Sequence, residues 1–284
     1  MYFQRSAICT QSKKNQLSPA SEVFTFLTNI MTWDPNKYNK FKSERFSPFY
    51  DLLALIRVRP DMDVIDLGCG TGELTRKLAD KLTAAHVVGI DSSKEMLNEA
   101  QAFGNENIEF IQRTIEDQLN SNQKWDLIFS NAAIQWSDNH EQLIPKIIAC
   151  LKKNGQLAIQ IPSQHDNLLN KMLDELVNEE PYRKALNNWS RRSPVLKTEV
   201  YAALLFDNGC KDMTIYEKIY PLIVPGPDDL FEWIAGTALI PYIERFTNEM
   251  KENFIQEFKI RIREKFSKSP VLYPFKRILM KATY

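Results

Sequence analysis

The 284-residue sequence is short of the residues that build disulfide frameworks and metal centres. It holds four cysteines, which lie far apart in the chain, and three histidines. None of them forms a Cys-x-x-Cys pair or a Cys/His ligand spacing, which argues against a disulfide scaffold and against a zinc site. We therefore expect reduced thiols, no bound metal and a cytoplasmic protein.

The sequence also lacks long apolar runs and an excess of either charge. No apolar run reaches the roughly 18 residues that a membrane span needs, and the first residues lack the apolar core and cleavage site of a signal peptide. Lysine plus arginine and aspartate plus glutamate both number 36. Without a basic surplus, we expect neither a nucleic-acid partner nor a membrane partner.

Hydrophobic periodicity divides the chain into four parts. Residues 1–30 show no helical or strand period, so we expect an unstructured arm, a tag or an over-long start. Residues 31–60 are predicted to form lid helices that are interrupted at Pro48. Residues 61–163 alternate apolar runs with helical patterns, and residues 164–284 are predicted to add cap helices and the remaining strands.

This alternation predicts an α/β fold, namely a doubly wound, mostly parallel sheet with right-handed crossovers and a helical cap over a ligand cleft. The strands are expected at 64–67, 87–90, 108–111, 126–130, 156–161, 213–220 and 275–283. The helices are expected at 75–82, 95–102, 142–151, 166–190, 195–208, 229–236 and 247–267.

The most informative segment is the run VIDLGCGTGE at residues 64–73. A buried strand ends at Asp66 and a helix follows, so Gly68 and Gly70 fall in a strand-to-helix turn, where α/β sheets bind ligands. Glycine allows the sharp turn and the close approach of a ligand. A second strand ends in Asp91, whose carboxylate can accept both hydrogen bonds of a ribose diol. The pattern therefore predicts a nucleotide-cofactor site.

Glu73, the residue after the last glycine, distinguishes a dinucleotide site from an S-adenosylmethionine site. The dinucleotide fingerprint requires a glycine at position 73, where Glu73 stands. A carboxylate at that position would repel a pyrophosphate. S-adenosylmethionine carries no phosphate, and its amino-acid end and sulfonium tolerate acidic neighbours, so the spacing favours this cofactor.

These residues resemble class I S-adenosylmethionine-dependent methyltransferases, and within them the trans-aconitate methyltransferase group. The second resemblance is carried by three stretches: Trp33-x-Pro35-x-x-Tyr38-x-x-Phe41-x-x-x-Arg45, Ser130-Asn131-Ala132-Ala133-Ile134-Gln135-Trp136 and Asp229-Leu230-Phe231-Glu232-Trp233-Ile234-x-Gly236-Thr237. It implies a Rossmann-like methyltransferase sheet with one antiparallel strand near the end. It also implies esterification of a carboxylate of a small acid.

Three alternatives stay open. The Gln135-Trp136 element also resembles the methyltransferases that esterify malonyl-acyl carrier protein. An N- or C-methyltransferase of another small molecule is a further enzymatic interpretation, and a non-catalytic cofactor-binding module is another.

The chain departs from the family pattern at two places. Where such enzymes commonly read the adenine amine with an acidic residue next to a small apolar one, this chain has Thr114-Ile115-Glu116. Where an arginine is expected before the Pro-aromatic step, it has Ile240. A buried acid with several carboxylates needs cationic partners, so the second departure favours an acid that is more apolar than aconitate.

The reaction asks little of the protein's own acids and bases. A carboxylate acceptor has a pKa near ~4 and is already ionised at pH 7, so no general base is required. Catalysis then depends on holding the acceptor beside the methyl group and excluding water.

Position and resemblance together define the expected site, with S-adenosylmethionine as cofactor, a small carboxylic acid as partner and a monomer or homodimer as assembly. Cofactor contacts are expected from Arg45, Asp66, Gly68, Cys69, Gly70, Asp91, Ser92, Met96, Thr114, Ile115, Glu116 and Asn131. Positioning is expected from Gln135, Trp136 and His165, and substrate contacts from Tyr38, Trp136, Arg191, Tyr201, Trp233 and Ile240.

Overall fold

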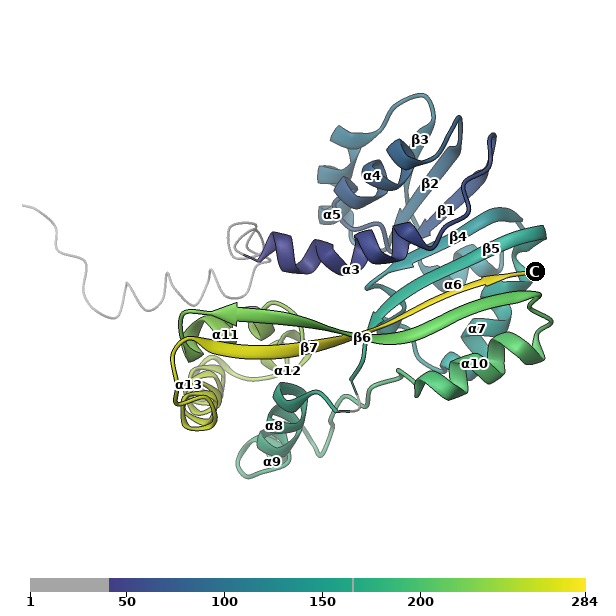
Figure 1. Ribbon diagram of the computed structural model, residues 1–284. Helices are drawn as coiled ribbons and strands as arrows, with labels where there is room; N and C mark the ends of the chain where they lie inside the picture. Colours follow the sequence, from purple (N-terminus) through teal and green to yellow (C-terminus); the bar gives the residue numbers. More distant parts are fainter. Residues whose placement is uncertain (1–40, 165) are drawn as a thin grey trace, which may run out of the picture.

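The computed structural model describes residues 41–164 and 166–284 (Figure 1). The expectations for residues 1–30, for Tyr38 and for His165 lie outside these described residues.

A seven-stranded sheet forms the centre of the molecule (Figure 1). Its strands are β1 (Asp63–Leu67), β2 (His86–Asp91), β3 (Ile108–Gln112), β4 (Trp125–Asn131), β5 (Leu151–Pro162), β6 (Asp212–Val224) and β7 (Val271–Thr283). Their order is β3-β2-β1-β4-β5-β7-β6. The first five strands are parallel to one another, and β7 is antiparallel to both of its neighbours. The predicted doubly wound, mostly parallel sheet is therefore confirmed.

Helices cover both faces of this sheet, which explains why the central strands are almost continuously apolar. One face carries α3 (Lys42–Ala54), α4 (Glu73–Lys81) and α5 (Lys94–Ala100) over the first hydrophobic cluster. The other carries α6 (Ile115–Leu119), α7 (His140–Ala149) and α10 (Thr198–Asp207) over the second cluster. Two short 3₁₀ turns, η1 (Gln101–Phe103) and η2 (Ile134–Trp136), follow α5 and β4.

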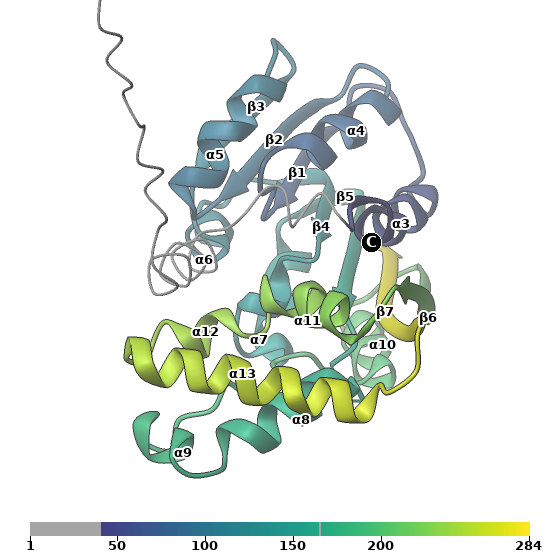
Figure 2. The ribbon, with the colours of Figure 1, turned by 90° about the vertical axis from the view of Figure 1, so that its left-hand side faces the viewer.

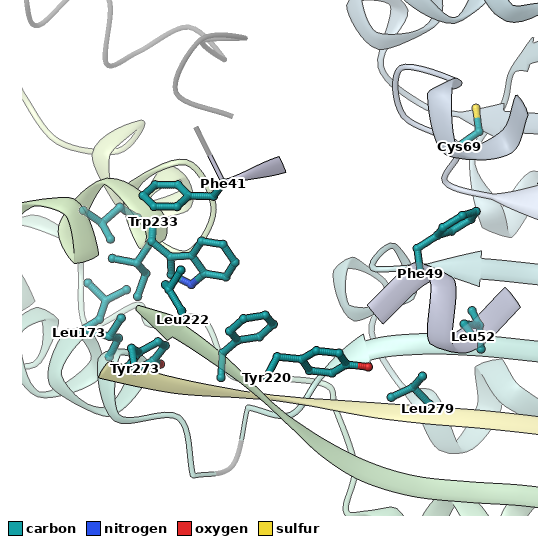
Figure 3. Close-up of a cluster of buried hydrophobic side chains, with 14 of the residues drawn as sticks. Phe41, Phe49, Leu52, Cys69, Leu173, Tyr220, Leu222, Trp233, Tyr273 and Leu279 are labelled. Atoms are coloured by element: carbon teal, nitrogen blue, oxygen red, sulfur yellow. The ribbon is translucent and has the colours of Figure 1, made fainter. Parts of the chain in front are cut away.

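Strands β6 and β7 extend past the ends of the other strands, and the cap helices lie at their far end. Figures 1 and 2 show helices α8 (Leu168–Val177), α9 (Tyr182–Ala185), α11 (Pro227–Ala235), α12 (Ile240–Ile243) and α13 (Asn248–Lys265) gathered at this end of the molecule. In Figure 3, Trp233 of the cap lies beside Phe41, while Tyr220 and Leu279 follow β6 and β7 toward the sheet. Because all four belong to one hydrophobic cluster, the cap and the α3 face share a continuous core.

The structure corrects several element boundaries. Helix α3 continues through Pro48, because burial of Phe49, Leu52 and Leu53 against the sheet outweighs one missing backbone hydrogen bond. The single helix expected at 166–190 is two helices, α8 and α9, which are separated before Pro181. Strands β6 and β7 are longer than expected, and the short helices α6 and α12 were not predicted.

Candidate active site

The turn after β1 and the end of β2 form one hydrogen-bonded unit. The backbone N–H groups of Gly68 and Cys69 donate to the Ile90 carbonyl over 2.9 and 2.8 Å. The Asp91 carboxylate accepts from the Gly70 N–H over 3.0 Å and, with its other oxygen, from the Ser93 N–H over 2.9 Å. A carboxylate oxygen can accept more than one bond. Asp91 is half-buried, and each of its oxygens can still take a hydroxyl.

Three glycines of this turn, Gly68, Gly70 and Gly72, have positive φ angles, and the first two have different roles. Gly68 and Gly70 have φ angles of +81° and +54°, which favour glycine. A Cβ on Gly68 would meet the Ala133 Cβ at 2.2 Å, whereas a Cβ on Gly70 would meet nothing within 4 Å. Gly68 therefore lets the loop after β4 pack closely, and Gly70 faces open space. Cys69 offers only its backbone, because burial raises the pKa of its thiol and the side chain lies in the core.

Acceptors without donors lie under this turn. Asp66 is 3% exposed; one of its oxygens accepts the Thr75 hydroxyl over 2.6 Å, and the other has no partner among the described residues. Burial raises the pKa of Asp66 to about 7. The buried side-chain oxygen of Asn131 also has no partner in the described range. Because the ammonium and sulfonium of S-adenosylmethionine supply positive charge and donors, these residues fit that cofactor.

The loops after β2 and β3 bring the other expected cofactor residues to the same edge. Asp91 and Gln112 are cross-strand partners at the ends of these strands. Beyond them, the chain continues into Ser92, which is exposed, and Met96, which is half-buried; after β3, Thr114 caps α6 by accepting the Asp117 N–H over 3.1 Å. The loops after β2 and β3 thus lie at the same edge of the sheet, but no contact among the described residues shows which of the two would bind the adenine ring.

Ile115 and Glu116 open helix α6 and point to different surroundings. Ile115 packs against the second cluster, whereas Glu116 is exposed and lines a cavity of about 390 Å³ with Trp136 on the α6–α7 side. A role of either residue at the cofactor stays a prediction.

Arg45 connects α3 with the cap. Its guanidinium lies 4.6 Å from the centre of the Trp233 ring, and it donates to the Trp233 carbonyl over 3.2 Å. The same helix is tied to α4 by the pair of Lys42 and Glu73, at 2.6 Å. Arg45 thus holds the lid to α11, and its expected contact with the cofactor stays a prediction.

A second cavity, of about 370 Å³, lies between η2, α8, the α9–α10 link and α12. Its lining residues are Gln135, Trp136, Gln164, Asn170, Lys171, Leu173, Asp174, Arg191, Arg192, Ser193, Ala238, Pro241 and Tyr242. The lining thus brings together three cationic side chains and one carboxylate, Asp174. Cationic groups that face one cavity can bind the carboxylates of an acid.

Arg191 is fixed at the centre of this cavity wall. Its guanidinium lies 4.3 Å from the centre of the Trp136 ring and donates to the Gln135 carbonyl over 3.1 Å. Its backbone N–H donates to the Tyr242 hydroxyl over 3.2 Å. Burial lowers the pKa of Arg191, and Asp138 opposes this effect; a guanidinium still stays charged. Gln135, Trp136 and Arg191, all expected at the site, are therefore together.

Three other expected substrate residues do not line this cavity. Tyr201 is fully buried in the second core, where its hydroxyl accepts the Leu196 N–H over 3.1 Å and bonds His140. Its predicted contact with substrate does not fit this placement, because α10 packs its apolar face on α7. Trp233 packs between Phe41 and Arg45, and Ile240 is half-buried beside the lining residues.

Sequence reasoning missed Lys171 as a cavity residue. Lys171 is exposed on α8 and pairs with Asp166 over 3.0 Å, and its sequence neighbourhood carries no motif. Tertiary folding alone places it opposite Arg191 and Arg192. In the described part of the chain, no three His, Cys, Asp or Glu side chains gather as metal ligands, and no helix is both long and apolar enough to cross a bilayer.

Comparison with known proteins agrees with this geometry. A family described as a methyltransferase domain matches residues 59–217. A trans-aconitate 2-methyltransferase of Deinococcus radiodurans is 39% identical over 259 residues, which cover 89% of this chain and 98% of the relative. One of Mycobacterium tuberculosis is 32% identical and covers 88% of this chain and 96% of its own length. The solved YcgJ protein of a Bacillus has a TM-score of 0.56 at 18% identity, covering 83% of this chain and 97% of that one.

Proposed function

Because this chain belongs to the trans-aconitate 2-methyltransferase family, we propose that it methylates a carboxylate of a small polycarboxylic acid of the trans-aconitate type. It is an S-adenosylmethionine-dependent methyltransferase.

The basic cavity beside Trp136 is the observation that carries the choice of acceptor. Lys171, Arg191 and Arg192 outnumber the one carboxylate in its wall, and Lys171 also pairs with Asp166 outside the wall. An acid that enters such a cavity loses hydration, and charged donors offset that loss more strongly than neutral donors do. The arginine that is missing at Ile240 is therefore replaced by cations from α8 and from the α9–α10 link. This favours a polycarboxylate over the more apolar acid that the sequence alone suggested.

Different residues of the site would bind S-adenosylmethionine and the acid. S-adenosylmethionine supplies a methyl group on a positively charged sulfur, which keeps the C–S electron pair when a carboxylate oxygen attacks the carbon. Asp91 would hold the ribose, and Asp66 with Asn131 would hold the ammonium. The acceptor is already ionised at pH 7, so orientation between Trp136 and the turn is the main contribution of the protein, on the order of several kcal/mol.

The test is turnover on a panel of tri-, di- and monocarboxylic acids, with amines and malonyl-acyl carrier protein as further acceptors. We expect trans-aconitate-like acids to be the best substrates. In the double variant Arg191→Gln/Arg192→Gln, KM for such an acid should rise about 10- to 150-fold, because charge-assisted hydrogen bonds contribute about 1.5–3 kcal/mol.

The matched control is Arg183→Gln, which removes an exposed arginine of α9 that pairs with Glu180 outside the cavity. It should leave KM unchanged, and both variants should bind S-adenosylhomocysteine normally. If wild-type protein methylated the malonyl thioester or an amine and none of the acids, the proposed acceptor would be wrong.

A further inference from the structure

Two side-chain amides lie next to each other where β4 and β5 end. Asn131 and Gln160 are cross-strand partners in the sheet. The side-chain oxygen of each is buried and accepts no hydrogen bond from any residue in the described ranges. Buried polar groups are nearly always paired, so each exception needs an explanation. A ligand that supplies the missing partner is one.

The same strand shows how a purely structural glutamine is satisfied. Gln156 lies four residues before Gln160, and side chains at this spacing share one face of a strand. The two are 2% and 1% exposed. The Gln156 amide accepts the Arg57 N–H over 2.9 Å and donates to the Arg57 carbonyl over 2.7 Å. Gln160 has no such backbone partner in the described chain, although it is as deeply buried.

Gln160 lies on a strand beside the cofactor turn, and the chain beyond it leads to the basic cavity. The strand order places β1, β4 and β5 side by side. Asp66, Asn131 and Gln160 point to the face of the sheet under α3. In a strand, side chains two positions apart share one face, and the residues two positions earlier all belong to the first cluster. These earlier residues are Val64, Phe129 and Ala158. Beyond Gln160, the chain leaves β5 and reaches Gln164, which lines the cavity. Gln160 is therefore joined to both regions, through its neighbour Asn131 on β4 and through the segment that follows β5.

The carboxylate that accepts the methyl group loses its charge in the reaction, whereas the other carboxylates of the acid keep theirs. One lone pair of its oxygen forms the bond to the methyl carbon, the C–S bond breaks with its electron pair on sulfur, and no proton moves. The carboxylate therefore loses its charge. A guanidinium would bind the charged ground state more tightly than the transition state and would slow the reaction. Neutral amide N–H groups bind the anion more weakly and lose less.

We propose that the side-chain amide of Gln160 holds the carboxylate that accepts the methyl group, while Asn131 stays with the ammonium of the cofactor and the cations of the cavity hold the carboxylates that keep their charge. The Gln160 amide can present its N–H₂ group by a half-turn about its last bond. The inference rests on the proposed function, since it requires a carboxylate acceptor.

The experiment compares Gln160→Leu with the control Gln156→Leu. In Gln160→Leu, kcat/KM for the best acid should fall about 10- to 150-fold, as expected for a lost hydrogen bond to a charged group. Its affinity for S-adenosylhomocysteine should stay within about threefold of wild type, and its thermal unfolding temperature should not fall. Gln156→Leu should show the reverse, with a lower unfolding temperature and an unchanged kcat/KM.

Two outcomes would overturn the inference. Unchanged kcat/KM in Gln160→Leu would show that the amide does not touch the acceptor. A loss of S-adenosylhomocysteine affinity as large as the loss of turnover would place the amide at the cofactor instead. Failure of the proposed function is visible separately, because wild-type protein would then methylate none of the acids.

Discussion

The cofactor turn and the basic cavity present opposite chemistry. The turn is surrounded by acceptors, with the carboxylates of Asp66 and Asp91 beside it. The cavity is surrounded by donors, among them Lys171 and Arg191. Each region thus complements its own ligand, since the methyl donor is cationic and the proposed acceptor is anionic. Equal numbers of acidic and basic residues in the whole chain conceal this division.

The two regions are also built differently. The turn is assembled from β1, β2 and the segments directly after them, so a short stretch of sequence fixes it. The cavity combines η2, α8, the α9–α10 link and α12, which are far apart in the sequence. Changes at the turn should therefore affect the cofactor alone, and changes in the cavity should affect the acid alone.

The largest effect is expected for Asp91→Ala. The substitution removes the proposed acceptor of the ribose hydroxyls and the acceptor of the Gly70 N–H. Affinity for S-adenosylhomocysteine should fall by about 2–4 kcal/mol, roughly 30- to 1000-fold, as measured by calorimetry. Asp80→Ala, which removes an exposed carboxylate of α4 paired with Arg76, is the control and should leave affinity unchanged. Normal binding by Asp91→Ala would contradict the assignment.

A smaller effect is expected from pH. Burial raises the pKa of Asp66 from 3.8 to about 7 in the unliganded protein. The ammonium group of S-adenosylhomocysteine, held beside Asp66, favours the ionised carboxyl, so binding below pH 7 releases a proton. Affinity for S-adenosylhomocysteine should therefore rise about tenfold per pH unit up to pH 7 and then level off.

The matching variant is Asp66→Asn, which should remove the rise of affinity with pH.

The raised pKa of Asp66 also affects the stability of the unliganded protein. Its contribution to the free energy of unfolding is greatest below pH 3.8 and is lost as pH rises through about 7. With saturating cofactor, kcat should stay flat from about pH 6 to 9, because the acceptor needs no base. A slope that persists in Asp66→Asn would assign the proton to another group.

The sequence predicts the cofactor turn well and the basic cavity poorly. The glycine turn, Asp91 and the alternation of strands and helices depend on local spacing, and the structure has them in place. The cavity depends on tertiary folding. Lys171 carries no local signal, and Tyr201 has the aromatic character of a ligand contact but lies on the buried face of α10, in the second core. Helical periodicity cannot say which of two buried faces meets a ligand.

The smallest effect is expected for Ile240→Arg. From the family pattern, which has an arginine at this position, the sequence predicts that the substitution raises kcat/KM for trans-aconitate, relative to a long-chain or aromatic monocarboxylate, about tenfold. In the structure, Ala238, Pro241 and Tyr242 line the cavity, whereas Ile240 is half-buried beside them. Lys171, Arg191 and Arg192 already supply positive charge, so a further cation outside the lining adds little. We expect kcat/KM for trans-aconitate to change by less than about twofold. A tenfold rise would show that α12 turns toward the acid when it binds, and that the cation missing from this segment limits the reaction.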